Sequence, residues 1–243
     1  MATQQDSRAL VKIGQGVHSE VFRQPGTRFV VQIFKPECPE LTVDKLCREY
    51  AYLCAAYARM PRLIPQQRLI ASRAHASLQE TILVKGYIPH RPELALHRVD
   101  PAQLRPTTLE QIRRFLRITR GLLADARPHP EMGGYASMVP DIIDPDGANL
   151  VIDLRSGDLT LIDTNRLIST HKLTQLHSAG QPLDIQPRRI HALLLRRLMY
   201  LESKYLGKPR AALKRDPLYA RYLDSAGFKE LFTASAAAGE PIQ

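Results

Sequence analysis

The chain has 243 residues, of which 44% are apolar and 24% charged, as in a soluble globular protein with one large domain or two closely packed lobes. It contains no run of about 18 apolar residues, so we expect no membrane span. Its net charge of +10 permits an anionic partner, such as a phosphorylated substrate, nucleic acid or peripheral contact with an acidic membrane surface. Only 6% of the residues are aromatic and none is Trp, which argues against a base-stacking platform for nucleic acid.

The first residues favour a cytoplasmic protein, and the cysteines do not contradict this. The first ten residues, MATQQDSRAL, lack the apolar core of a cleavable export signal. The three cysteines, Cys38, Cys47 and Cys54, are an odd number without a close CxxC pair. We therefore predict reduced thiols and not a zinc site.

A strand, a glycine turn and a returning strand are predicted over residues 10–22, followed by a β-branched run, Val30–Phe34, that ends at Lys35. The turn has the pattern Gly14-x-Gly16-x-x-Ser19-x-Val21. Glycines let the backbone approach an anion closely, and successive N–H groups can surround phosphate oxygens. Strands flank the turn on both sides, so the dinucleotide-binding motif, which needs a helix after the glycines, does not fit. A plain hairpin is the alternative.

An amphipathic helix is predicted over residues 41–60, with Thr42 or Asp44 as its cap and Pro61 at its end. Glu49 lies in its middle, either as a solvated surface residue or as a partner for Lys35. Two more strands are predicted at residues 64–71 and 81–84. The sequence Gly86-Tyr87-Ile88-Pro89 then breaks the chain, and we predict a hinge between two lobes here.

Beyond this break the pattern is mainly helical. The sequence Thr107-x-x-Glu110 predicts a capping box that opens a long helix. Its arginines indicate a solvated face or, alternatively, a binding surface. Two further helices are predicted at about residues 187–205 and 209–228, after an irregular segment over residues 169–184.

The central stretch, residues 138–167, combines a polar loop with a hairpin. The loop carries Asp144 and Asn149, and two short strands, residues 150–153 and 159–162, flank a turn at residues 155–158. The hairpin brings Asn149 close to Asp163, which follows the second strand. Carboxylate and amide oxygens are hard ligands that suit Mg²⁺ rather than zinc. The alternative is an acidic loop with solvated carboxylates.

The order of these features resembles the protein-kinase-like superfamily, including its aminoglycoside-phosphotransferase and lipopolysaccharide-kinase branches. The resemblance covers about residues 10–205 and is strongest at GQGVHSEV, VVQIFK, DPDGANLVID and LTLID. It implies a two-lobed α+β fold. The first lobe would be a small antiparallel sheet with one helix (residues 1–84), and the second would be mainly helical (90–232). A hinge (85–89) would join them, and a flexible tail (233–243) would follow.

The resemblance also implies roles for particular residues. Gly14, Gly16 and Ser19 would cover the nucleotide phosphates, Lys35 would hold them, and Glu49 would orient Lys35. Asp144 would act as the catalytic base or orient the attacking hydroxyl, while Asn149 and Asp163 would bind Mg²⁺. The adenine would lie near Lys85–Ile88, including Tyr87, between apolar residues. The candidates for these contacts are Ile13, Val21, Val31, Leu150 and Ile162.

The resemblance therefore implies an ATP- and Mg²⁺-dependent kinase that phosphorylates a hydroxyl of a protein, a sugar, a small alcohol or an anionic glycolipid. Several family features are missing. Ile142-Ile143 stand where His-Arg is usual, Thr164-Asn165 follow Asp163 in place of Phe-Gly, and no Ala-Pro-Glu closes an activation segment. We therefore expect no regulation by phosphorylation of an activation loop. A charged residue, Lys85, stands at the gatekeeper position before the hinge. The alternative is that its side chain points to solvent and does not act as a gatekeeper.

Two details leave alternatives open. The spacing between Lys35 and Glu49 is short, which leaves open a pairing of the lysine with another acid, and Glu37 and Glu40 are poorer candidates for it. The missing motifs also leave open a pseudokinase, which would bind nucleotide or act as a scaffold without turnover. A basic nucleic-acid-binding protein, with steeply salt-dependent affinity, is a third hypothesis.

Overall fold

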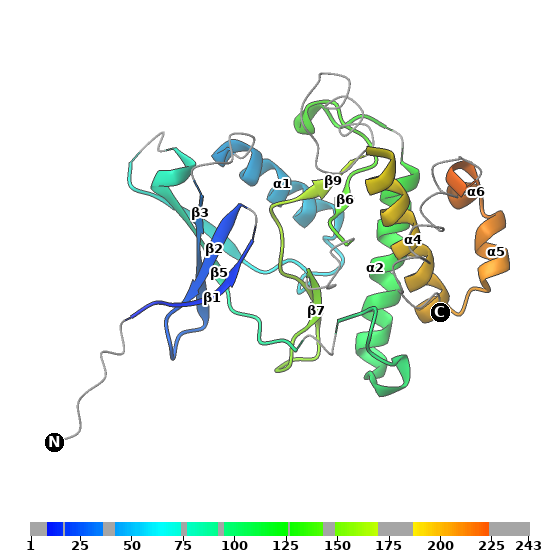
Figure 1. Cartoon of the computed structure of the whole chain (residues 1–243), viewed down its shortest axis with the longest axis horizontal. Helices are drawn as coiled ribbons and strands as arrows, with labels where there is room; N and C mark the ends of the chain where they lie inside the picture. The colour runs from blue at the N-terminus through cyan, green and yellow to red at the C-terminus, as the bar shows by residue number, and fades with distance from the viewer. Residues whose placement is uncertain are drawn as a thin grey trace.

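The structure, a computed structural model, describes residues 9–16, 18–35, 42–73, 77–91, 95–125, 127–142, 149–169 and 187–223. An antiparallel sheet forms the N-terminal part of the chain, and most of the helices follow it (Figure 1). The predicted α+β fold is therefore confirmed. The tail, residues 233–243, lies outside the described residues.

The N-terminal sheet has five strands in the order β1-β2-β3-β5-β4, all antiparallel. Their bounds are β1 Val11–Gln15, β2 Ser19–Arg23, β3 Phe29–Phe34, β4 Gln67–Ala71 and β5 Thr81–Gly86. Each predicted strand is thus present, although β5 runs two residues beyond its predicted end at Val84.

The two faces of this sheet differ sharply in burial. Residues opposite each other in an antiparallel pair point to the same face, so the register assigns each side chain. The face that we call the inner face carries Ser19, Val21, Arg23, Val30, Gln32, Phe34, Gln67, Leu83 and Lys85. The outer face carries Glu20, Phe22, Phe29, Val31 and Ile33, and two of these, Phe29 and Ile33, are exposed.

One helix, α1 (Val43–Ala56), packs on the inner face. Its Leu46 forms a small core with Phe34, Leu83 and Leu78, the last from the 3-10 helix η1 (Leu78–Glu80). The Thr42 side chain accepts a hydrogen bond from the Lys45 N–H, so the predicted cap is confirmed. The helix ends at Ala56, before the predicted limit at Met60, and turns follow.

The rest of the chain is mainly helical (Figure 1). Its elements are η3 Pro101–Gln103, α2 Pro106–Ala124, η4 Pro130–Met132, β6 Val139–Pro140, β7 Leu150–Ile152, β8 Leu159–Leu161, β9 Leu167–Ile168, α4 Pro187–Leu206, α5 Arg210–Arg215 and α6 Pro217–Leu223. The strands pair as two short ladders, β6 with β9 and β7 with β8.

Two helix predictions need correction. The predicted capping box at Thr107 and Glu110 is wrong, because α2 begins after Arg105 with Pro106 at its first position and has no side-chain cap. The predicted helix at about residues 209–228 is two helices in its described part, α5 and α6. Asp216 separates them just before Pro217, since proline disfavours helical backbone in the residue before it.

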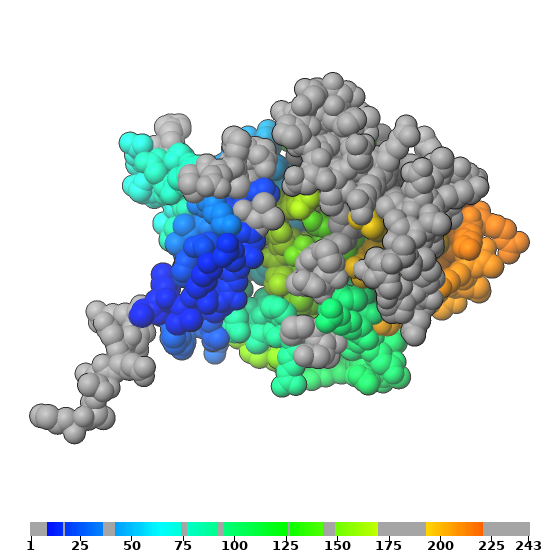
Figure 2. Space-filling view, viewed as in Figure 1, coloured from blue at the N-terminus to red at the C-terminus, as the bar shows by residue number. Residues whose placement is uncertain are grey.

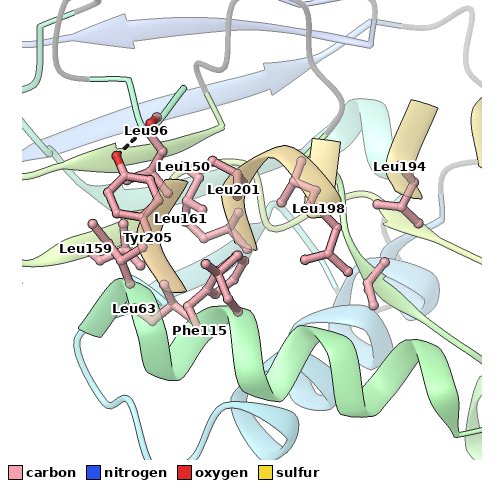
Figure 3. Close-up of a cluster of buried hydrophobic side chains, with 14 of the residues drawn as sticks. Leu63, Leu96, Phe115, Leu150, Leu159, Leu161, Leu194, Leu198, Leu201 and Tyr205 are labelled. Atoms are coloured by element: carbon pink, nitrogen blue, oxygen red, sulfur yellow. Dashed lines mark hydrogen bonds between the residues drawn. The ribbon is translucent and has the colours of Figure 1, made fainter. Parts of the chain in front are cut away.

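The largest core joins α2, α4 and the β7–β8 hairpin. Figure 3 shows Phe115 of α2, Leu194, Leu198 and Leu201 of α4, and Leu150, Leu159 and Leu161 of the hairpin in this cluster. The Tyr205 hydroxyl donates to the Leu96 carbonyl at 2.7 Å, which anchors the end of α4 to the 95–99 turn (Figure 3). The hairpin is therefore fixed by the helical core beneath it.

The hairpin region lies between the sheet and the helices. In Figure 2 the β7–β9 region (yellow-green) is visible between the N-terminal strands (blue) and the C-terminal helices (orange). The Leu161 N–H donates to the Leu63 carbonyl at 2.8 Å, and the Arg62 guanidinium pairs with Asp158 at 2.9 Å. The segment between α1 and β4 thus ties the hairpin to the sheet.

Among the described residues, no helix is long and apolar enough to cross a membrane. Cys47 and Cys54 are free, exposed thiols, as predicted, and Cys38 lies outside the described residues.

A buried ion-pair cluster leads to a prediction about stability. Glu202 of α4 is fully buried and binds Arg120 at 3.2 Å, Lys208 at 3.0 Å and the Tyr219 hydroxyl at 2.7 Å. Glu202→Ala removes a fully buried carboxylate and leaves the Tyr219 hydroxyl and the partly exposed Arg120 and Lys208 without this acceptor, so we expect it to lower the free energy of unfolding by about 2 kcal/mol. Chemical denaturation measures this.

The matched control is Glu110→Ala, which breaks the exposed pair with Arg117. A pair of this kind contributes less than about 1 kcal/mol. Equal losses of stability in the two variants would contradict the role assigned to the buried cluster.

Candidate functional site

The β7–β8 hairpin brings Asn149 and Asp163 together, as the sequence predicted. Leu150 pairs with Leu161, and the Ile162 N–H donates to the Asn149 carbonyl at 2.8 Å, so the pairing continues one step beyond the strands. Gly157 in the connecting turn has a φ of +74°, a conformation that favours glycine. The predicted catalytic residue Asp144 lies outside the described residues.

The two predicted metal ligands are each held by a local hydrogen bond. The Asn149 side-chain amide donates to the Asp141 carbonyl at 3.3 Å, and Asp163 Oδ1 accepts the Asn165 N–H at 2.9 Å. The Asp141 carboxylate is itself buried and pairs with Arg166 at 3.4 Å. Sequence reasoning missed Asp141, since a single aspartate after a proline resembles an ordinary turn residue.

The segment that carries Asp163, residues 162–165, lies against the inner face of the sheet. Three of its residues form hydrogen bonds there: the Lys85 ammonium donates to the Ile162 carbonyl at 3.4 Å, the Thr164 hydroxyl to Gln67 at 2.6 Å, and the Asn165 amide to Gln32 at 3.2 Å. Sequence reasoning missed Gln32, Gln67, Thr164 and Asn165, although strand alternation could have placed Gln32 on the inner face. The sheet therefore covers the side of the hairpin that holds Asp163.

Lys85 is the buried cation of this contact. Its side chain is 7% exposed, which corrects the alternative that it points to solvent. Burial lowers the pKa of Lys85 to about 8, against the opposing attraction of Asp163, which raises it. The ammonium thus lies in a dry site close to the Asp163 carboxylate.

Lys35 lies on the other side of the sheet. Its N–H donates to the His18 carbonyl at 2.9 Å, which continues the β2–β3 pairing and points its side chain opposite to Phe34. The Lys35 ammonium donates to the Gly16 carbonyl at 2.9 Å. It also lies close enough to Glu20, on the outer face, to help lower the pKa of that carboxylate, after the larger effects of Lys12.

Glu49 is buried in α1, which corrects the alternative of a solvated surface residue. It forms an ion pair with Lys45 at 3.8 Å. The expected pairing of Lys35 with Glu49 is therefore replaced by two other contacts. The physical reason is strand alternation, which directs Lys35 away from the face on which α1 packs.

The glycine turn connects β1 and β2 tightly. The Gly16 N–H donates to the Ser19 carbonyl at 2.8 Å, and the buried Ser19 hydroxyl accepts from the Gln32 side chain at 2.6 Å. Neither Gly14 nor Gly16 has a positive φ, and a Cβ atom at either would meet its nearest atom at 3.8 Å. The fold itself therefore does not require glycine at these positions.

The expected adenine contacts are divided between the two faces. Val21 pairs with Gln32 on the inner face, whereas Val31 pairs with Phe22 on the outer face. Val21 and Val31 therefore cannot contact the same side of one base. Val30 shares the inner face with Val21 and is the better candidate.

Tyr87 follows β5 and connects the sheet to the hairpin. Its N–H donates to the Arg28 carbonyl at 2.8 Å, and its carbonyl accepts from the Arg155 guanidinium at 2.6 Å. The Arg23 guanidinium lies 3.8 Å from the centre of its ring. The backbone N–H, the backbone carbonyl and one face of the ring of Tyr87 are therefore all in contact with other residues of the chain.

A pocket lies beside Asn149 on the helical side. Its lining residues are Leu96, His97, Ile142, Asn149, Leu150, Arg197 and Leu201. Its volume of about 20 Å³ is room for about one water molecule, so the described residues form no substrate-sized cavity here.

No cluster of three His, Cys, Asp or Glu side chains suited to a metal occurs among the described residues, which do not include Asp144. A site built from Asp163 and Asn149 has only one such carboxylate. It would resemble the usual Mg²⁺ sites, in which one or two carboxylates act together with substrate phosphates and water.

The sequence matches no protein-family model and no curated protein. Similar solved structures include a microcompartment-associated aminopropanol kinase, at 10% identity and a TM-score of 0.39, which covers 96% of this chain and 94% of that one. Choline kinase LicA from Streptococcus pneumoniae has 11% identity and a TM-score of 0.36 over 91% and 93% of the two chains. Spectinomycin phosphotransferase APH(9)-Ia, in complex with ADP and spectinomycin, has 11% identity and a TM-score of 0.32 over 92% and 88%. These values are too low to assign a function, which has to come from the site itself.

The lowered pKa of Lys85 predicts how stability changes with pH. Between about pH 8 and the ordinary lysine pKa of 10.5, the unfolded chain binds a proton at Lys85 that the folded protein releases. This group therefore makes the protein more stable as pH rises through that range, and it costs stability below it. We expect Lys85→Met to be more stable than the wild type near pH 7, with a difference that shrinks towards pH 10.

Chemical denaturation at both pH values measures the difference, and Lys214→Met, at an exposed position of α5, is the control. A difference between wild type and Lys85→Met that stays constant over this range would contradict the assigned pKa shift.

Proposed function

We propose that this protein is an ATP- and Mg²⁺-dependent phosphotransferase that transfers the γ-phosphate to a hydroxyl group. One observation carries the proposal. The β7–β8 hairpin brings Asn149 close to Asp163, and the segment of Asp163 lies against the inner face of the sheet, where the buried Lys85 ammonium donates to the Ile162 carbonyl. Phosphoryl transfer needs positioned reactants and neutralised charge more than covalent help from the protein, and this arrangement offers both.

Asn149 and Asp163 would hold the metal. Because the Asn149 amide nitrogen donates to Asp141, its amide oxygen is the atom that would bind a cation. Asp163 would contribute its carboxylate, which the Asn165 N–H orients. Mg²⁺, when bound, supplies positive charge to the phosphate oxygens.

Asp144 would accept the hydrogen bond of the attacking hydroxyl, from the loop that precedes Asn149. This role rests on the sequence pattern Asp-x-x-x-x-Asn. A cytoplasmic location, as the sequence favours, would fit the use of ATP.

The glycine turn would cover the phosphates. Since the backbone does not require glycine at positions 14 and 16, the missing side chains are better explained by a ligand that approaches the turn. Ser19 would act indirectly, because its hydroxyl is already bound to Gln32. The base would lie on the inner face near Val21, Val30 and Tyr87.

The acceptor would lie beside Asp144, which would meet its hydroxyl. The net charge of +10 favours a hydroxyl compound that carries an anionic group, such as a phosphorylated glycolipid or small molecule. A protein hydroxyl beside acidic residues has the same chemistry.

One observation favours a second candidate, a nucleotide-binding protein without turnover. Lys35, the lysine expected at the phosphates, lies on the side of the sheet away from Asp163. Loss of such a lysine removes charge neutralisation at the phosphates and slows transfer.

The test of the enzyme is the Asp163→Ala variant. Wild-type protein incubated with labelled ATP, Mg²⁺ and a fractionated cell extract should label one pool of protein, lipid or small molecules. We expect Asp163→Ala to lower this rate by about 100-fold or more, because the metal loses its carboxylate.

Asp100→Ala, which removes an exposed carboxylate at the start of η3, is the control. If wild type and Asp163→Ala label the pool equally, the protein is not this kind of enzyme. Binding of Mg²⁺–ATP without any transfer would favour the second candidate.

A further inference from the structure

The inner-face position of β3 that meets the Asp163 segment is occupied by Gln32, a neutral residue. Gln32 pairs with Val21 of β2 and Leu83 of β5, and its side chain bridges the Ser19 hydroxyl at 2.6 Å and the Asn165 amide at 3.2 Å. An amide in this place can position its neighbours. It cannot neutralise the charge of a triphosphate.

Two cations stand on the inner face of the described sheet, Arg23 and Lys85. The Arg23 guanidinium stacks on the Tyr87 ring, at the edge of the sheet where the chain leaves for the helical part. Lys85 lies two strands away from Arg23, opposite Val30 of β3 and Gln67 of β4, and contacts the segment that carries Asp163. Lys85 is therefore the cation placed beside the proposed metal ligand.

The hydrogen bond that Lys85 makes in this structure is weak enough for a ligand to replace it. Its hydrogen bond to the Ile162 carbonyl is 3.4 Å long, beyond the usual range for a strong bond of this type. A phosphate oxygen is a much better acceptor for an ammonium, because both groups are charged. The lysine is also buried, which strengthens the attraction further.

Burial of an ammonium without a strong partner is costly, so its retention needs a reason. Lys85 is 7% exposed, and the hydrogen bond of its ammonium to the Ile162 carbonyl is a long one of 3.4 Å. A bound triphosphate would supply the missing negative charge. Groups whose charge is costly in the absence of ligand are concentrated at functional sites.

We infer that Lys85 of β5 is the residue that binds the nucleotide phosphates, since Gln32 of β3 is neutral, and that Lys35 does not have this role. The inference rests on the proposed function and names a binding residue of the same site. Gln32 is then a positioning residue, which holds Ser19 and Asn165 around the phosphates.

The experiment is isothermal titration of Mg²⁺–ATP and of adenosine into wild type, Lys85→Met, Lys35→Met and the control Lys214→Met. We expect Lys85→Met to weaken Mg²⁺–ATP binding by about tenfold or more, as lost charged contacts do, and to leave adenosine binding unchanged, since adenosine has no phosphate. The loss in Lys85→Met should exceed the loss in Lys35→Met.

Two rescue variants make the test independent of folding defects. Lys85→Arg keeps the charge and should retain more Mg²⁺–ATP affinity than Lys85→Met. The double variant Gln32→Lys/Lys85→Met places an ammonium on β3 instead and should recover part of the affinity. Thermal unfolding checks that each variant is folded.

The outcomes separate this inference from the proposed function. A larger loss of Mg²⁺–ATP binding in Lys35→Met than in Lys85→Met overturns the inference and leaves the proposed function standing. An equal loss of adenosine and Mg²⁺–ATP binding in Lys85→Met also overturns it, because the lysine would then be structural. Failure of wild-type protein to bind Mg²⁺–ATP overturns both.

Discussion

The site depends on the contact between residues 162–165 and the inner face of the N-terminal sheet. Three side chains from three different strands, Gln32, Gln67 and Lys85, form hydrogen bonds to this short segment. The β7–β8 hairpin below is fixed by the helical core, and the sheet above is fixed by α1. Because both sides are anchored, the carboxylate of Asp163 is held where the sheet and the helical part of the chain meet.

The same contact explains why the site costs stability. A buried lysine beside one carboxylate loses hydration that its neighbours do not fully replace. In a core built only for stability, an apolar side chain would be better at this position of β5. The polar groups around it, Gln67 and Thr164, bind each other, which leaves the Lys85 ammonium with its long bond to Ile162. A ligand that brings negative charge would reverse this balance, and this relation between stability and function is common at binding sites.

Much of the architecture follows from local pattern. The five strands, the helix α1 with its Thr42 cap, and the helices α2 and α4 were predictable from alternation, helical spacing and turn residues. The hairpin that joins Asn149 to Asp163 was predictable for the same reason, because its turn and its apolar runs are close in sequence. Helix ends were less predictable. Pro106 sets the start of α2 in place of the expected capping box, and Pro217 divides α5 from α6 within one run of helical spacing.

The sequence by itself determined the order of the elements and the hairpin that places Asn149 beside Ile162, next to Asp163, and it supplied the hypothesis of metal-assisted chemistry at oxygen ligands. Only the tertiary structure shows which lysine lies beside the segment that carries Asp163. The order of residues near β3 favours Lys35, but the face to which a side chain points depends on strand register and on what packs against each face. Lys85 is distant in sequence from Asp163, and their meeting requires both the β3–β5 pairing and the docking of residues 162–165. Such long-range contacts leave no local signal in the chain.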